Sequence, residues 1–172
     1  DLDKVFAVFT ALKAWPDAVR TLEMKSATLM MLEEREAAIA TLFQVADLWR
    51  DAANKPEAAG GALEKILELD PANRGAYEQA LKQYGQLNDW RAYAQVMDRY
   101  LPHLVTEEEK VTTLRQLARV QEEKLGQKDV AFLQFCRALQ LHPSDPGIRE
   151  EVERLAEETG SYDELAAVYE EV

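Results

Sequence analysis

The sequence predicts an all-α fold built from repeated helical hairpins, with no β-sheet. Residues 42–100 and 114–172 carry one pattern at a constant offset, so that Leu42 matches Leu114, 72 positions later. Apolar residues fall at helical spacing nearly throughout the chain. The composition is rich in Ala, Leu and Glu, with only seven Gly and six Pro among 172 residues. Self-similarity at a fixed period is the mark of a repeat architecture.

The first half of the chain contains five predicted helices. An apolar stripe indicates the first helix and consists of Leu2, Val5, Phe6, Phe9 and Leu12. Pro16 opens the second, because the first turn of a helix needs no N–H donor there. A third helix is predicted over Glu34–Ala53, and Lys55-Pro56 separates it from a fourth, which runs to Asp70-Pro71. Asn73 can cap the fifth helix.

The second half repeats this arrangement. Asn88-Asp89 forms a turn before a helix over Trp90–Leu101. Thr106 can cap a helix that reaches Leu125, and the three glutamates after it make the first turn of that helix acidic. Further helices are predicted over Asp129–Leu141, Asp145–Thr159 and Tyr162–Val172, which brings the number to ten. Short connections make consecutive helices antiparallel neighbours. The chain is therefore expected to form one domain, residues 1–172, with hairpins at about 1–32, 33–70, 73–103, 106–142 and 145–172.

Two segments carry a recognisable hairpin motif. In AFLQFCRALQLHPSD, small, aromatic, small, leucine and proline residues follow at set spacing: Ala131, Phe135, Ala138, Leu139 and Pro143. AAGGALEKILELDPAN repeats the spacing with Ala59, Leu63, Ile66, Leu67 and Pro71. These segments resemble the tetratricopeptide repeat, nominally 34 residues long. The resemblance implies a right-handed α-solenoid of about five hairpins, whose first helices line a concave groove. One departure is that the repeats of Leu42 and Leu114 need about one extra residue in the first helix or its turn.

Candidates for catalysis are few. The two histidines, His103 and His142, belong to no metal-binding or acid–base pair of helical spacing, and no glycine-rich phosphate loop is present. Cys136 could act as a nucleophile with His142, but six residues along a helix place the two side chains well apart. Apolar neighbours favour a packing cysteine. We therefore expect no enzyme activity, no cofactor and no metal site.

Charge narrows the choice of partner. The chain has 32 Asp and Glu against 20 Lys and Arg, a net charge of −12. Nucleic acid and anionic membranes are disfavoured, because both require clustered basic residues. No apolar run is long enough for membrane insertion. The chain begins at Asp1 without an initiator Met, so we expect a piece of a longer protein, and the free cysteine with no visible signal favours a cytoplasmic location.

The resemblance to the tetratricopeptide repeat implies groove-facing positions in the first helices, paired four residues apart: Phe43 and Asp47, Glu78 and Lys82, Arg115 and Arg119, and Glu150 and Arg154. One hypothesis is that the cations among these residues bind an acidic or C-terminal carboxylate segment of a partner. The alternative is that they pair with Glu78, Glu122 and Glu150 and only solubilise the surface. The family's Lys/Asn/Arg clamp for chaperone tails is not reproduced, so binding of such tails is not expected.

These observations predict a non-catalytic scaffold that binds a peptide or a folded protein. A second hypothesis is a structural spacer or self-association module that acts through the repeat ends, where Leu165, Val168 and Val172 should pack on a neighbour. A third is a regulatory domain attached to an enzyme elsewhere in a longer chain. The repeat pattern alone does not name the partner.

Overall fold

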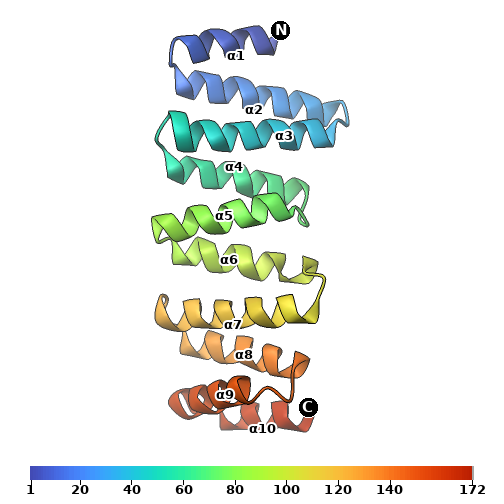
Figure 1. The fold of residues 1–172 in the computed structure, drawn as a ribbon, viewed down its shortest axis with the longest axis vertical. Coiled ribbons are helices and arrows are strands. Elements are labelled where there is room, and N and C mark those ends of the chain that lie inside the picture. Colours follow the sequence, from blue (N-terminus) through green and yellow to red (C-terminus); the bar gives the residue numbers. More distant parts are fainter. Residues whose placement is uncertain (172) are drawn as a thin grey trace. The chain divides into compact units, whose positions relative to one another are not determined.

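The structure, a computed structural model, describes residues 1–171 and is helical throughout (Figure 1). Within that range it contains ten α-helices and no strand, as the sequence predicts. Val172, the last residue of the tenth predicted helix, lies outside the described residues. The helices are α1 (Leu2–Ala11), α2 (Trp15–Met31), α3 (Arg35–Asp47), α4 (Pro56–Leu69), α5 (Arg74–Leu87), α6 (Trp90–Tyr100), α7 (Glu107–Glu123), α8 (Lys128–Leu141), α9 (Pro146–Thr159) and α10 (Tyr162–Glu171).

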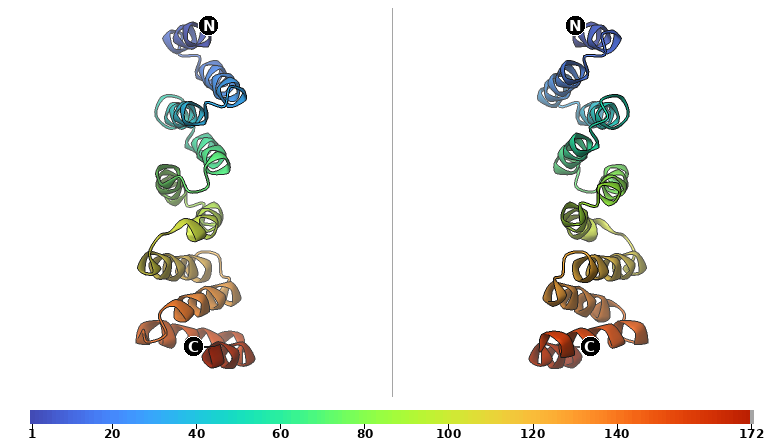
Figure 2. Two further views of the ribbon diagram at one scale, coloured as in Figure 1. Left: turned by 90° about the vertical axis from the view of Figure 1, so that its right-hand side faces the viewer. Right: turned by 90° about the vertical axis from the view of Figure 1, so that its left-hand side faces the viewer.

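The chain packs as two compact units, Asp1–Asp89 with α1–α5 and Trp90–Val172 with α6–α10. The division falls between α5 and α6, inside the hairpin predicted over residues 73–103. In each unit every helix packs against the next one along the chain. In the first unit α1, α3 and α5 form one layer and α2 and α4 a second (Figure 2). The fold is all-α and built from helical hairpins, as the sequence predicts.

The residues that carry the hairpin motif are buried as the motif requires. Ala131, Ala138 and Leu139 are fully buried, and Phe135 is 1% exposed. Small side chains let neighbouring helix axes approach, and the large ones fill the adjoining layer. Seven aromatic residues occupy equivalent positions in the repeats, and this repetition predicts that all seven pack in the core. Tyr84 and Phe135 are buried. The other five are only half-buried: Phe6, Phe9, Trp15, Trp49 and Trp90.

The predicted helix starts are confirmed by their hydrogen bonds. The side chain of Asn73 accepts the N–H of Ala76 at 3.0 Å. At the start of α7, Thr106 Oγ1 accepts the N–H of Glu109 at 3.1 Å, and Glu109 Oε2 accepts the N–H of Thr106 at 3.4 Å. This reciprocal pair satisfies two backbone donors that a helix start leaves open.

The third predicted helix, Glu34–Ala53, departs from α-helical geometry in its last turn. Helix α3 ends at Asp47, and Leu48–Ala52 forms a π-helical turn, η1. Ala53 donates to the carbonyl of Leu48 at 2.9 Å, a bond that spans five residues instead of four. The matching turn after α7 has the same wide bond, from Leu125 to Val120 at 3.2 Å. Both copies of the repeat therefore absorb their extra residue in a widened turn at the end of the first helix.

At Gly60, helix α4 packs directly against the Tyr84 ring of α5. A methyl group placed on Gly60 would lie 2.8 Å from Cε1 of Tyr84, which is too close for two carbon atoms. The Tyr84 hydroxyl donates to Glu64 Oε1 at 3.1 Å and so fixes the far end of the ring. The adjacent Gly61 is exposed and has open space around it.

Gly60→Ala and Gly61→Ala are expected to change stability in opposite directions. The buried methyl group of Gly60→Ala displaces the Tyr84 ring and should lower the free energy of unfolding by about 1–3 kcal/mol. Gly61→Ala should raise it by about 0.5–1 kcal/mol, because alanine loses less backbone entropy in a helix. Urea unfolding followed by circular dichroism measures both. Equal effects at the two positions would show that the α4–α5 contact does not require glycine.

Candidate functional site

A polar depression of about 460 Å³ lies in the first unit, between the end of α3 and one face of α5. We call it the α3–α5 depression. Its lining residues come from α3, the η1 turn and α5: Asp47, Arg50, Asp51, Gln79, Lys82, Gln83 and Gln86. The structure thus brings together two of the predicted groove residues, Asp47 and Lys82.

An ion-pair network occupies one side of the α3–α5 depression. Arg50 donates from Nη2 to Asp47 at 2.5 Å, and from Nε and Nη2 to the two oxygens of Asp51 at 2.9 Å each. The hydrogen bond from Arg50 lowers the pKa of Asp51, and the nearby charge of Lys82 adds to the effect. Lys82 itself is exposed and makes no ion pair within the described chain. The charges of these four residues balance, so the depression is not the strongly cationic site that carboxylate binding would favour.

Amide side chains form the other side. Gln79, Gln83 and Gln86 follow at spacings of four and three and so share one face of α5. Gln83 is only 4% exposed. The side-chain oxygen of Gln79 is buried and has no hydrogen-bond partner within residues 1–171. A buried acceptor without a donor costs free energy, so this oxygen is a place where a bound group could donate.

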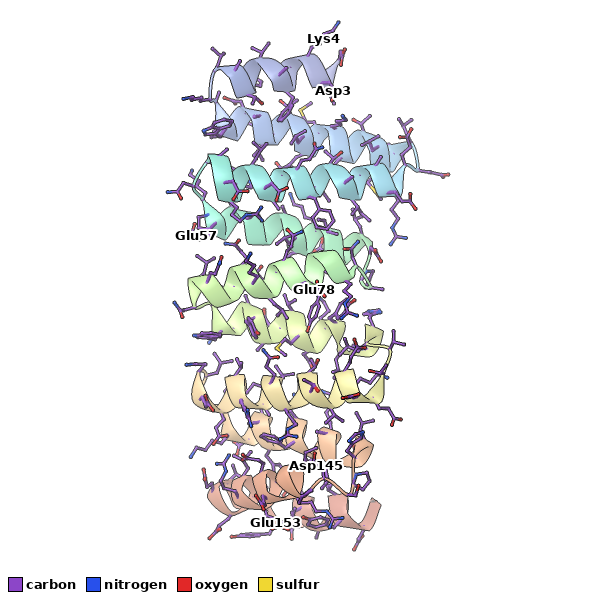
Figure 3. The ribbon with its side chains drawn as sticks, in the orientation of Figure 1. Asp3, Lys4, Glu57, Glu78, Asp145 and Glu153 are labelled. Carbon is purple, nitrogen blue, oxygen red and sulfur yellow. The ribbon has the colours of Figure 1, made fainter. Side chains whose placement is uncertain are left out.

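The other two predicted groove residues of the first unit do not line this depression. Phe43 is half-buried, with its ring tip 3.7 Å from where a methyl group on Gly75 would lie. Glu78 is exposed on α5 and accepts a hydrogen bond from Arg74 Nε at 2.9 Å (Figure 3). Phe43 thus contacts the start of the next first helix, and Glu78 lies in an exposed ion pair.

In the second unit Arg115 has a structural contact. Its Nη1 donates to Asp145 Oδ2 at 3.3 Å. Asp145 caps α9, since its other oxygen accepts the N–H groups of Gly147 at 2.8 Å and Ile148 at 3.1 Å. Figure 3 shows Asp145 at the start of this helix. Arg115 therefore holds the cap of the next first helix, in the position where its repeat partner Phe43 packs near Gly75.

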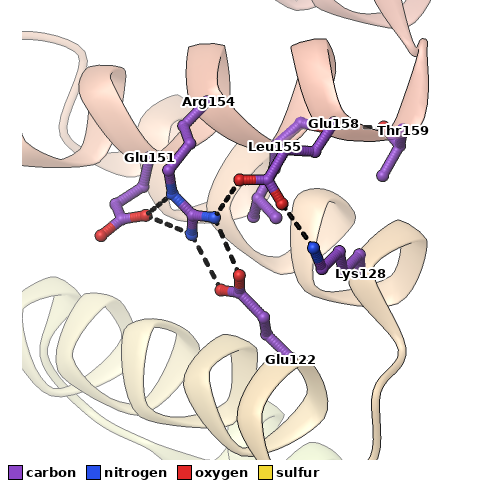
Figure 4. Close-up of polar contacts among 7 residues, drawn as sticks. All are labelled: Glu122, Lys128, Glu151, Arg154, Leu155, Glu158 and Thr159. Atoms are coloured by element: carbon purple, nitrogen blue, oxygen red, sulfur yellow. Dashed lines mark hydrogen bonds and ion pairs between the residues drawn. The ribbon is translucent and has the colours of Figure 1, made fainter.

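Arg154 is the centre of the densest ion-pair cluster in the described chain (Figure 4). Its guanidinium donates two bonds of 2.8 Å to the carboxylate of Glu122, and further bonds to Glu151 at 2.6 and 2.9 Å and to Glu158 at 2.9 Å. Lys128 donates to Glu158 at 2.6 Å. These hydrogen bonds, above all those to Glu122, raise the pKa of Arg154.

The cations of the predicted groove therefore divide into two kinds. Arg115 and Arg154 form ion pairs with carboxylates of the chain itself. The pair between Arg154 and Glu122 is among those expected if the cations only pair with neighbouring glutamates and solubilise the surface. Lys82 and Arg119 are exposed and have no ion pair within residues 1–171. Glu150 is also exposed. Of the predicted set, the exposed charges without an ion pair in the described chain are therefore Lys82, Arg119 and Glu150, whereas Asp47 is exposed but paired with Arg50.

The side chains considered for chemistry lie apart from this surface. Cys136 is 5% exposed, and burial raises the pKa of its thiol to about 11, so it is almost wholly protonated at neutral pH. His103 and His142 are exposed. Among the described residues, no three His, Cys, Asp or Glu side chains lie where they could share a metal ion. No helix in that range is both long and apolar enough to span a bilayer.

Sequence reasoning missed most of the α3–α5 depression. Arg50 and Asp51 reach it because the η1 turn widens the backbone after Asp47. The sequence did contain a sign of this turn, because the repeats of Leu42 and Leu114 need about one extra residue in the first helix or its turn. The three glutamines of α5 share a face at helical spacing, which the sequence also showed, but the burial of Gln83 depends on how α5 packs within the unit.

No model of a known protein family matches the chain, and no curated protein matches its sequence. Among solved structures it is similar to a crystal structure of MamA protein, with 15% identity over 99% of this chain and 87% of that one, at a TM-score of 0.45. It is also similar to the N-terminal domain of stress-induced protein-1 (STI-1) from C. elegans. There the identity is 17% over 70% of this chain and 96% of that one, at a TM-score of 0.49. Neither similarity identifies a partner for this chain.

Replacing Arg154 by methionine should destabilise the second unit. Glu122, whose side chain is only 17% exposed, would lose its bidentate partner beside two other carboxylates. We expect the free energy of unfolding at pH 7 to fall by about 1–2 kcal/mol. Arg119→Met, on an exposed arginine without an ion pair in the described chain, should change it by less than about 0.5 kcal/mol. Urea unfolding of the two variants compares them directly.

The same variant has a predicted pH dependence. Hydrogen bonds from Lys128 and Arg154 hold the pKa of Glu158 below its usual value of 4.5. A carboxylate with a lowered folded-state pKa stabilises the fold above its unfolded-state pKa, and this contribution is lost as the pH falls through the folded-state value. The stability difference between wild type and Arg154→Met should therefore shrink as the pH is lowered below about 4. A constant difference down to pH 3 would contradict this assignment.

Proposed function

We propose that this chain is a non-catalytic protein–protein interaction scaffold that binds a peptide or folded protein on the first-helix face of its hairpins. The observation that carries the proposal is the α3–α5 depression, where Asp47 and Lys82 meet beside the unsatisfied oxygen of Gln79. The free thiol of Cys136 suits a reducing compartment such as the cytoplasm.

The chemistry of the depression suits an extended protein segment. Gln79 needs a donor, and the N–H groups of a peptide main chain supply donors at regular intervals. Gln83 and Gln86 offer both donors and acceptors to the same main chain. Lys82 lies beside them, exposed and without an ion pair among residues 1–171. Its ammonium group can donate to one acidic side chain or C-terminal carboxylate, although Asp47 and Asp51 keep the depression as a whole close to neutral.

In the second unit, Arg119 is the matching cation. It is exposed on α7, whereas Arg115 and Arg154 are already held by Asp145 and Glu122. We therefore propose a separate contact patch in each unit, with Lys82 and Asp47 in the first and Arg119 and Glu150 in the second. Arg115 contributes indirectly by holding the start of α9.

Charge reversal at Lys82 and Arg119 should weaken partner binding. The partner is first captured from a lysate of the source organism on immobilised wild-type protein, and its affinity is then measured by calorimetry. Lys82→Glu together with Arg119→Glu should weaken binding by about tenfold or more, because two charge-assisted contacts become repulsive. Arg20→Glu, on an exposed arginine of α2, is the matched control for the charge change. Unchanged affinity in the double variant would overturn the assignment.

A second candidate function, self-association, has one observation in its favour. Helix α1 contains no buried residue and exposes Val5 at 42%, Val8 at 56% and Leu12 at 70%. These residues follow at spacings of three and four and form an apolar stripe. At the other end of the chain, Leu165 and Val168 already pack partly against the core of their own unit. Val172, the third end residue expected to pack on a neighbour, lies outside the described residues.

Sedimentation across a concentration series distinguishes this candidate. If the α1 stripe mediates self-association, wild-type protein should shift to a larger species as concentration rises, and Val8→Glu with Leu12→Glu should keep it monomeric. Met24→Glu, at an exposed apolar residue of α2, should leave the association unchanged. A wild-type monomer at every concentration would exclude self-association through α1.

A further inference from the structure

The second unit has a crevice above α7, between α6 and α8, that is separate from the proposed binding surface. Two depressions of about 290 and 320 Å³ lie along it. Their lining residues on α7 itself include Lys110, Leu114 and Gln121, at spacings of four and seven, so they share one face of the helix. Arg119 lies on a different face of α7. We call this feature the α6–α8 crevice.

Arg137 lies between the two depressions and contacts residues that line the second one. It lines the first one, and its Nη1 donates to Asp98 Oδ1 at 3.2 Å and to Gln134 Oε1 at 2.7 Å. Asp98 and Gln134 line the second depression. The bridge from α8 to α6 therefore lies between the two depressions, with the apolar one on one side and the amide-rich one on the other.

The apolar end suits an aliphatic side chain next to an acidic one. Leu101 and Leu114 are buried at 6% and 1% exposure and form its floor with the partly buried Leu141. Lys110 and Arg137 line the same depression, which has no acidic residue in its lining. Lys110 makes no ion pair within the described chain. Arg137 is already paired with Asp98, so Lys110 is the cation left at the edge of this apolar floor. On a protein of net charge −12, such a cation favours a ligand that is apolar and carries an acidic group.

The amide-rich end suits a peptide main chain. Gln121 is 7% exposed, and its side-chain oxygen is buried without a hydrogen-bond partner among residues 1–171. Gln134, also 7% exposed, and the exposed Gln95 and Gln127 line the same depression. A main-chain N–H of a bound segment would satisfy Gln121, and the other amides offer both donors and acceptors.

We propose that the α6–α8 crevice is a second docking site, and that its occupant is an extended segment of a partner protein. The segment places an aliphatic residue on Leu101 and Leu114, an adjacent Asp or Glu against Lys110, and its main chain along Gln121. Leu141 and Val130, at the two ends of the crevice on α8, are separated by about 16 Å of helix. An extended strand covers that length with about five residues.

The test starts from random peptides of about seven residues displayed on phage and selected on the whole chain. We expect enrichment of peptides with Leu, Ile or Val beside Asp or Glu. The strongest of these is synthesised with a fluorescent label, and its dissociation constant is measured by fluorescence polarisation. Lys110→Glu should weaken binding by about tenfold. It should leave the fold intact, since a carboxylate near the start of α7 suits the helix dipole.

Two further variants make the result specific. Gln121→Met removes the unsatisfied oxygen at similar volume and should weaken binding several-fold. Arg119→Glu makes the same charge change on another face of α7 and should leave binding unchanged. Loss of binding with Arg119→Glu but not with Lys110→Glu would assign the peptide to the groove and overturn this inference while supporting the proposed function. Failure to enrich acidic–aliphatic peptides would also overturn it, without bearing on Lys82 and Arg119.

Discussion

Close approach of neighbouring helices at small residues is the constraint on which this structure depends. Each helix can lie directly on the next because small residues stand at the contacts. These residues are fully buried or closely covered: Ala59, Gly60, Ala131 and Ala138. That arrangement buries the large apolar residues of the hairpin motif, such as Leu63, Phe135 and Leu139. Binding capacity is left to the polar faces of the helices and to the turns between them.

The extra residue in the first helix of two repeats links the fold to both candidate sites. After α3 it produces the η1 turn, which places Arg50 and Asp51 in the α3–α5 depression. After α7 the equivalent wide turn ends beside Leu125 and Gln127, which line the α6–α8 crevice together with Gln121. One departure from the ideal repeat thus contributes lining residues to two separate surfaces, because a widened turn pushes its side chains beyond the regular packing layer.

Differences between the two repeat copies have separate structural and functional meanings. Phe43 and Arg115 both contact the start of the next first helix, one by packing near Gly75 and the other by an ion pair with Asp145. Their difference is therefore explained within the fold. Asp47 and Arg119 differ in a position that remains exposed, and this makes it the better place to look for partner selectivity.

The sequence by itself determined the all-α fold, the ten helices, the capping at Asn73 and Thr106, and the buried residues of the hairpin motif, because each follows from spacing within one or two turns of helix. It named Asp47 and Lys82 but did not determine which cations stay free. Arg154 bonds Glu122 across 32 residues, and Arg115 bonds Asp145 across 30. Such contacts depend on the distance between neighbouring helices and on the reach of long side chains, so only the tertiary structure decided them.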